Sequence, residues 1–338
     1  MMNSMAGNQD FPWRKWIASY QVPITSRSLW QLVNTLLPFI AMWSLMAFSL
    51  KATYWLTLLL AFTTAGFMVR TFSIFHDCCH GSFLRTTRAN AILGVITGVL
   101  TFTDFGSWRR DHNTHHATAG DLDRRGVGDV MTLTVQEYLT LSPWKRFTYR
   151  VMHSPWILFT IGATVVFLFA HRFPGPSHGP KERMSILWHD LALAGLFTTL
   201  VLLLGWRTVI LVQLPVLIIG ASVGIWLFYV QHQFEGVYWE RHQDWVFERA
   251  CMEGCSYYQL PRLLQWFSGN IGFHHIHHLS PRIPNYALEQ CYCENQGLQI
   301  KPLTLRSSLQ SLRLRLYDEA ARRLVGWEVL RQYKAPAD

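Results

Sequence analysis

Long apolar runs dominate the hydrophobic pattern of this 338-residue chain. Four of them are long enough for a helix that rises about 1.5 Å per residue to cross about 30 Å of hydrocarbon. These predicted spans are Leu29–Leu50, Ala52–Phe75, Ser185–Leu204 and Thr208–Val230. Only short polar breaks, Lys51 and Gly205-Trp206-Arg207, divide each pair, so the pattern predicts two tight helical hairpins.

Histidines gather at the polar edges of these apolar runs, in the sequences "FHDCCHGSF", "DHNTHH", "YVQHQF" and "GFHHIHHL". On a helix, residues three and four apart lie on one face. The boxed histidines that share a face, together with the lone His232, are His76, His80, His112, His115, His116, His232, His274, His277 and His278. We expect these nine to meet in one site.

Two weaker apolar segments, Ala89–Phe105 and Ser154–Ala170, could be re-entrant, interfacial or buried against other helices. A shared histidine site requires an even number of membrane crossings between successive histidine groups. The weak segments are therefore predicted not to span, and the fold class is an all-α integral membrane protein with four transmembrane helices. A helical cap on one side carries the histidines.

The division of the chain follows from this topology. We expect an N-terminal segment at 1–28, a first hairpin at 29–75, a region with two histidine boxes at 76–184, a second hairpin at 185–230 and a cap at 231–338. The cap contains the third box. Its C-terminal part carries leucines at helical period, which predicts an amphipathic helix after Pro302.

Charge indicates the orientation of the predicted spans. Arginines and lysines concentrate on the histidine side, whereas the opposite side keeps little beyond Lys51 and Arg207. By the positive-inside rule the histidine face and both termini are expected in the cytosol. The formal net charge of +9 suits anionic lipid or an acidic partner. Nucleic acid is disfavoured, because the basic residues flank apolar runs instead of forming a compact patch.

The N-terminus shows no apolar core followed by a small-residue cleavage site, so no signal peptide is expected. The six cysteines are predicted to be free thiols in a reducing compartment. Structural zinc at Cys251, Cys255, Cys291 and Cys293 stays as an alternative, although the spacing is loose.

A cluster of imidazoles favours metal binding. A single histidine is more often a surface or core residue than a ligand, and His153, His171, His178, His189 and His242 are interpreted in that way. Nine clustered imidazoles would repel one another if protonated, whereas a metal binds the neutral rings. Histidine ligands suit iron, copper, nickel or zinc. One zinc needs three or four ligands, so nine suit two metals with open positions.

Two further residues of the boxes are candidates to support the ligands. Asp77 could accept a hydrogen bond from a ligand imidazole, with a surface or capping aspartate as the alternative. His275 lies off the shared face and is expected behind the ligands or in a structural role. A zinc protease is disfavoured, because "HDCCH" lacks the glutamate of H-E-x-x-H.

Together the boxes resemble the membrane-bound fatty acid desaturases, whose histidine boxes follow this order. "FHDCCHGSF", "WRRDHNTHHATAGDLDRRGVGDVMTLTVQEY" and "NIGFHHIHHLSPRIPNY" are similar to the acyl-lipid branch with the delta-12 (omega-6) enzymes. The resemblance covers roughly residues 26–327. Box one departs from the family at Cys79, where a glycine is usual.

The resemblance implies two iron ions held by the nine histidines, and O2-dependent removal of two hydrogens from the acyl chain of a membrane lipid. It also implies an external electron donor, ferredoxin or a b-type cytochrome with its reductase. The chain itself shows no glycine-rich dinucleotide loop. A hydroxylase or oxygenase with the same metals is the nearest alternative. A metal transporter is disfavoured, because ionisable residues are rare within the predicted spans.

Overall fold

Two helical hairpins form the apolar part of the molecule. The computed structural model describes residues 12–334. The hairpins pair α2 (Thr25–Ser49) with α3 (Tyr54–His80), and α9 (Pro180–Leu204) with α10 (Trp206–His232). All four helices are long and apolar enough to cross a membrane. The prediction of four spans is confirmed, and the helices extend beyond the predicted bounds far enough to include His76, His80 and His232.

Local sequence explains where these helices begin and end. The side chain of Thr53 accepts a hydrogen bond from the backbone N–H of Trp55 and caps α3. Gly205 alone separates α9 from α10, with a φ of +82° that an L side chain rarely adopts. Along α3 and α10, buried residues such as Met68, Val216 and Leu217 form one core between the hairpins. The hairpins therefore hold the ends of α3 and α10 in fixed positions beside each other.

The two weaker apolar segments form bent pairs of shorter helices. The first comprises α4 (Thr87–Leu100) and α5 (Phe105–Thr118), which meet at 101°. The second comprises α7 (Pro143–Met152) and the stretch Ile157–Arg172, which meet at 68°. That stretch contains the π-helix η2 (Ile157–Gly162), α8 (Ala163–Leu168) and η3 (Ala170–Arg172). Each pair is a broken span or a re-entrant loop by length and composition. A re-entrant segment was one of the alternatives, and the absence of a span here stays a prediction.

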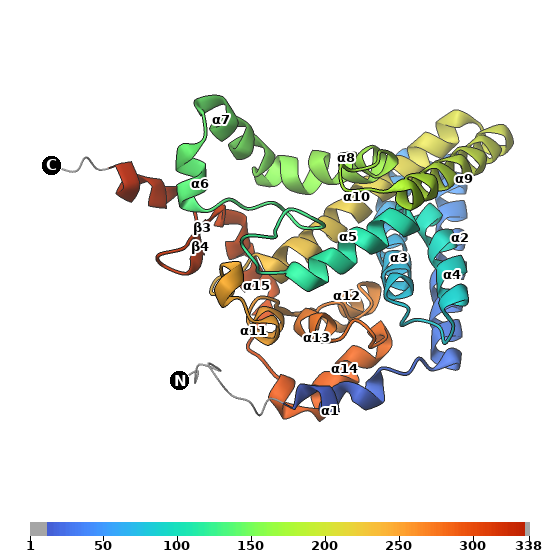
Figure 1. Cartoon of the computed structure of the whole chain (residues 1–338). Coiled ribbons are helices and arrows are strands. Elements are labelled where there is room, and N and C mark those ends of the chain that lie inside the picture. Colours follow the sequence, from blue (N-terminus) through green and yellow to red (C-terminus); the bar gives the residue numbers. More distant parts are fainter. Residues whose placement is uncertain (1–11, 335–338) are drawn as a thin grey trace.

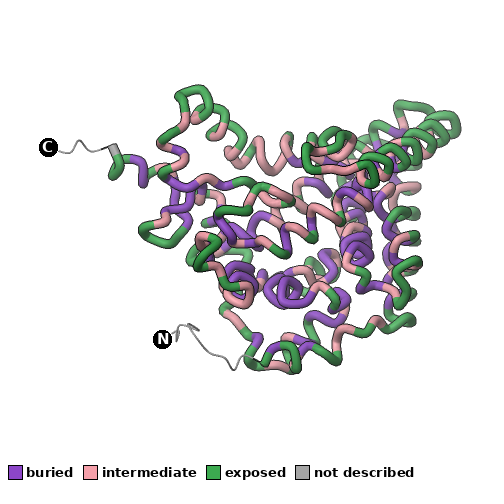
Figure 2. The backbone as a smooth tube through the Cα atoms, in the orientation of Figure 1, coloured by how far each residue is buried: buried purple, intermediate pink, exposed green. Residues whose placement is uncertain are grey.

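The remaining elements form the cap, below and to the left of the long helices in Figure 1. Its helices are α1 (Trp13–Ile17), η1 (Ala18–Tyr20), α6 (Val135–Thr140), η4 (His242–Asp244), α11 (Phe247–Met252), α12 (Arg262–Phe267), α13 (His274–Leu279), α14 (Asn285–Glu294) and η5 (Gln296–Leu298). Figure 2 shows burial concentrated where α3, α5, α10 and α13 converge. The first eleven residues of the predicted N-terminal segment lie outside the described residues.

The predicted C-terminal amphipathic helix is wrong. Residues after Pro302 form β2 (Pro302–Thr304), α15 (Leu305–Ser308), η6 (Leu309–Arg313), β3 (Leu316–Asp318), β4 (Arg323–Val325) and η7 (Trp327–Lys334). Strand β2 pairs with β1 (Tyr257–Gln259) in parallel, and β3 pairs with β4 in an antiparallel hairpin. The buried Arg315 donates to the carbonyls of Leu312 and Leu314. The backbone N–H groups of Arg315 and Tyr317 donate to the carbonyls of Val325 and Leu133, so they do not form helical hydrogen bonds, although the leucines repeat at helical period.

Candidate metal centre

The nine histidines expected to meet do so, in two groups. Their side chains come from the ends of α3 and α10, from α5 and from α13. The first group, named here group A, comprises His76, His80, His112, His116 and His277. The second, group B, comprises His115, His232, His274 and His278. Within each group one nitrogen per histidine lies within 4.8 Å of all the others, a spacing that suits a single ion.

Group A is linked through short separations between Nε2 atoms. His112 Nε2 lies 2.9 Å from that of His76 and 3.1 Å from that of His116. His277 Nε2 lies 3.1 Å from that of His116. Nε2 of His80 is buried without a hydrogen-bond partner, while its ring contacts the rings of His76, His112, His116 and His277. All five rings therefore converge on one point.

Group B has the same construction with four histidines. His232 Nε2 lies 3.0 Å from that of His115 and 2.9 Å from that of His274. His278 Nε2 lies 3.1 Å from that of His274. His232, which stood alone in the sequence, thus lies close to two other members of its group. The ring of Phe228, one turn before His232, covers both His115 and His232 at centroid separations of 5.2 and 5.3 Å.

Hydrogen bonds alone cannot satisfy these nitrogens, because each ring nitrogen of a neutral imidazole carries either one hydrogen or one lone pair. Nε2 of His112, His116, His232 and His274 each faces two other Nε2 atoms. A cation at the centre of each group would accept every lone pair at once. Two nitrogens bound at right angles about 2.1 Å from one ion lie about 3.0 Å apart, which matches the observed separations. The residues therefore fit two metal ions.

Short-range features of the sequence fix these histidines in place. The Asp104 carboxylate accepts a hydrogen bond from the Ser107 backbone N–H and caps α5. This cap fixes where α5 begins and therefore where its histidines lie along the helix. Gly81 ends α3 directly after His80 with a φ of +68°. Gly128 also has a positive φ, and a Cβ there would lie 2.9 Å from the Asp111 carbonyl and 3.2 Å from His115 Cβ. The loop at residues 126–130 can pack on α5 only because residue 128 is glycine.

Burial keeps the imidazoles of the cap neutral. The pKa values of His112, His115 and His116 lie well below their ordinary value, first because the rings are buried and then because other histidines surround them. On α13 the same causes, in the same order, lower the pKa values of His274, His277 and His278. Neutral rings are the form that binds a metal.

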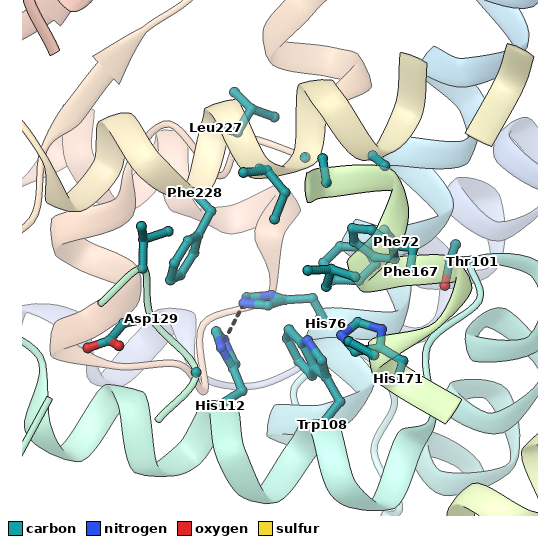
Figure 3. A pocket seen from close by; sticks show the side chains of 18 of the residues that line it. Phe72, His76, Thr101, Trp108, His112, Asp129, Phe167, His171, Leu227 and Phe228 are labelled. Carbon is teal, nitrogen blue, oxygen red and sulfur yellow. Dashed lines mark hydrogen bonds between the residues drawn. The ribbon is translucent and has the colours of Figure 1, made fainter. Parts of the chain in front are cut away.

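An apolar cavity of about 670 Å³ reaches both groups. Its walls come mainly from α3, α5, α8 and α10, and His76 and His112 of group A and His274 of group B lie at its polar end. Figure 3 shows His76 and His112 facing each other there, below Phe228 and beside Trp108. A cavity of this size falls within the range that buries a small molecule or chain. It therefore offers an apolar ligand a path past both groups.

Comparisons with known proteins agree with this construction. The family model for fatty acid desaturases matches residues 52–301. A fatty acid desaturase of Bacillus subtilis is 45% identical over 318 residues, which cover 94% of this chain and 90% of that protein. The chain belongs to the fatty acid desaturase family. An sn-1 oleoyl-lipid 12-desaturase of Anabaena variabilis is 26% identical over 259 residues, covering 73% of this chain and 71% of that protein.

A more distant relative adds a second regiochemistry to the comparison. An sn-1 acyl-lipid omega-3 desaturase (ferredoxin) of Synechocystis is 25% identical over 232 residues, covering 65% of this chain and 61% of that protein. The protein is therefore a desaturase, an enzyme that is also an integral membrane protein. Its relatives differ in where they act.

Asp77 lies where it can orient a histidine of the desaturase site. Its Oδ1 is 3.6 Å from His76 Nδ1, and its Oδ2 accepts hydrogen bonds from the backbone N–H and the side-chain amide of Asn285, both at 2.8 Å. The carboxylate therefore connects the first box to the start of α14, just after the third. His275 faces away from both groups and donates its Nε2–H to the Leu298 carbonyl at 2.8 Å, which favours the structural role.

Sequence reasoning missed several residues of the desaturase cavity. Trp108 stacks on His112 with ring centroids 4.2 Å apart and fixes that ring; its position one turn before His112 was a usable signal. His178, interpreted as an ordinary histidine, lines the cavity, and its Nε2 is 2.9 Å from the Asp111 carboxylate. The two are 67 residues apart, so no local pattern linked them.

The cysteines of the desaturase are free, as predicted. Five are buried and Cys293 is exposed. Among residues 12–334, the groups of three or more side chains placed to hold a metal consist of histidines alone. The alternative of structural zinc at the cysteines therefore gains no support from the described part of the chain.

Proposed function

We propose that the protein introduces a double bond into the acyl chain of a membrane lipid, at a di-iron centre held by groups A and B. The observation that carries this proposal is an apolar cavity whose wall includes histidines of both groups. An acyl chain in that cavity would pass the positions of both ions. The family supplies the reaction class, and the geometry supports the assignment of the nine histidines as ligands.

The chemistry of the substrate explains the need for a metal. A methylene group has no acidic proton, so acid–base catalysis by side chains cannot begin the reaction. Bound iron would supply the activation of O2 that removes hydrogen from such a carbon. Overall, the acyl chain loses two hydrogens, and O2 with two electrons and two protons from a donor system yields two waters.

The residues of the chain would perform the other tasks. Phe72, Phe167 and Leu227 line the cavity, exclude water and hold an acyl chain without polar contacts. Trp108 and Phe228 hold the ligand rings, as their contacts with His112 and His232 show. Asp77 would keep His76 in the tautomer whose Nε2 faces the metal. Precise positioning of one carbon pair against the metal would then select the bond that is oxidised.

We also propose the position of the new double bond, the orientation of the protein in the membrane and the class of electron donor. The box sequences and the oleoyl-lipid 12-desaturase relatives support action of the delta-12 (omega-6) kind. The positive-inside distribution of arginine and lysine supports a cytosolic histidine face and cytosolic termini. Ferredoxin, which the name of the Synechocystis relative mentions, is one candidate donor, and a b-type cytochrome is the other. The basic charge of the chain would suit an acidic donor.

The test is expression in a host whose lipids are saturated or monounsaturated, with a ferredoxin and its reductase present. Gas chromatography with mass spectrometry should show new double bonds and their positions, and hydroxyl groups are analysed in the same extract. Unchanged lipids would overturn the proposal, and hydroxylated products would replace it with the oxygenase alternative. A double bond at another position would overturn the regiochemistry alone.

A further inference from the structure

Helix α7 has its apolar side facing outward. Trp144 and Phe147 are 72% and 57% exposed, and their rings stack at 5.5 Å. Val151, one turn further, lies on the same face and is also exposed. An exposed contiguous apolar face of this kind marks a surface that contacts lipid or protein.

The other side of α7 contacts the protein through Tyr149, which packs against the cluster that contains Tyr138, and through two arginine side chains. Arg146 donates through Nε to the Leu141 carbonyl at 2.9 Å. Arg150 donates through Nε to the Tyr138 hydroxyl at 2.7 Å and stacks over Trp327. Helices on the surface of soluble proteins have the reverse arrangement, with the apolar stripe toward the core. Because Trp144, Phe147 and Val151 point away from the protein instead, α7 suits an apolar exterior.

The apolar exterior continues from α7 toward the long helices. Trp156, at the bend after α7, is 80% exposed. Ile161, Val165 and Phe169 are exposed along η2 and α8, and α8 is followed by the candidate span α9. Figure 1 shows α7 and α8 following each other along the upper edge of the molecule toward α9. Tryptophans at the edge of such a surface are typical of the membrane interface.

The cavity opens beside this surface. Four residues that line it also have large exposed apolar side chains, namely Met131, Met152, Val165 and Phe173. Met152 is the last residue of α7, and Ile157 at the start of η2 is a further part of the cavity wall. The end of the outward-facing helix is therefore also the rim of the cavity mouth.

We propose that α7 lies in the cytosolic leaflet with Trp144, Phe147 and Val151 among the lipid chains, and that acyl chains enter the cavity sideways from this leaflet past Met152. The occupant of the apolar face is thus the bilayer, because that face is continuous with the surface of the candidate spans. The entry route rests on the proposed function. It assigns the substrate as an acyl chain of a lipid in the bilayer, since a soluble carrier would approach from the aqueous side.

Fluorescent labelling in lipid nanodiscs tests the position of α7. In a Cys293→Ser background, which removes the exposed native thiol, Phe147→Cys and Gln243→Cys are labelled with an environment-sensitive fluorophore. Gln243 is an exposed residue of the cap and serves as control. The label at 147 should emit at shorter wavelength and be quenched several-fold more by lipids with brominated acyl chains. Equal quenching at both sites, or a blue-shifted label at 147 that bromine does not quench, overturns the proposal; the second result would indicate a protein partner or a second copy.

Substitution at the rim tests the entry route. Met152→Arg places a charge where acyl chains would pass, and because a charge in hydrocarbon is unfavourable, product formation from nanodisc lipids should fall by about tenfold or more. Bound iron should be unchanged, and Gln243→Arg should have wild-type activity. Wild-type activity in Met152→Arg overturns the route. A wild-type protein that forms no product defeats the proposed function instead, while the labelling result still decides the position of α7.

Discussion

Each imidazole of groups A and B faces other members of its own group. Removal of one ring therefore tests the ion proposed for that group. His115→Ala should disrupt group B and His277→Ala group A. Because the remaining rings cannot replace a missing ligand at the same point, we expect activity to fall more than about 100-fold, at least as far as loss of an outer partner does. Iron per protein, measured by plasma emission spectroscopy, should fall in both variants.

His242→Ala is the control for these substitutions. The His242 ring is exposed and lies 2.7 Å from Asp121, outside both groups. The buried Asp121 carboxylate keeps Arg124 Nε at 3.7 Å and the backbone N–H of Asp123 as partners, so activity and iron should stay near wild type. His178, although it was first interpreted as an ordinary residue, is unsuitable as a control because it lines the cavity. Full activity in His115→Ala would refute the assignment of group B as a metal site.

Asp77 gives a finer test, because it lies beside His76, a proposed ligand, without belonging to group A or group B. Asp77→Asn keeps the size of the side chain but removes the charge near His76 Nδ1 and places an amide opposite Asn285. Loss of such an outer partner typically costs 10- to 100-fold in metal affinity or activity. We expect iron affinity, measured by competition with a chelator, to fall by about 10-fold or more. Unchanged affinity in a folded variant would show that Asp77 only joins α3 to α14.

At the scale of the element, α10 presents glycines as well as large side chains to the cavity. Gly224 lines the cavity, and a Cβ at this position would meet no atom within 4 Å. Gly224→Phe should therefore fold and fill part of the cavity. Products from long acyl chains should fall by about 10-fold relative to those from shorter chains, which corresponds to about 1.4 kcal/mol of lost binding. Gas chromatography of the total lipid measures both.

Gly195 on α9 provides a matched control for Gly224. A Cβ at residue 195 also meets nothing within 4 Å, but this glycine is exposed on the outside of the hairpin and does not line the cavity. Gly195→Phe should therefore leave the distribution of chain lengths unchanged. If both variants changed it equally, the effect would come from the helices as a whole and not from the cavity.

The elements show which parts of the sequence could be interpreted correctly. The spans were predictable because each is a long continuous apolar run, and the boxed histidines because residues three and four apart share a helix face. The number of spans followed from the assumption of a shared site. The tail failed because periodicity does not record tertiary contacts. Its leucines repeat at helical period, yet Arg315 forms hydrogen bonds to carbonyls in its own segment, and Tyr317 donates through its backbone N–H to Leu133, far away in the chain.

In the molecule as a whole, the histidines come from four segments that lie far apart in the sequence. These segments converge and place neutral imidazole rings in one buried volume. The pKa values of the histidines on α5 and α13 are lowered by burial and by neighbouring histidines. In the unfolded chain these rings titrate near pH 6.5. Below that pH the unfolded state binds more protons than the folded state, so stability falls as pH falls. Above about pH 7.5 both states hold the rings neutral, and stability from this source is constant.

Metal-free protein should therefore lose thermal stability steeply between about pH 7 and pH 5.5. The unfolding midpoint in detergent, followed by circular dichroism, measures the loss. Iron should raise the midpoint at about pH 7.5, because it binds only the folded state, and this gain should vanish with acid as protons displace the metal. His115→Ala should show a shallower pH slope and His242→Ala the wild-type slope. An unfolding midpoint independent of pH would mean that the imidazole rings are not buried together in the folded protein. The inference that the four segments form one site would then be wrong.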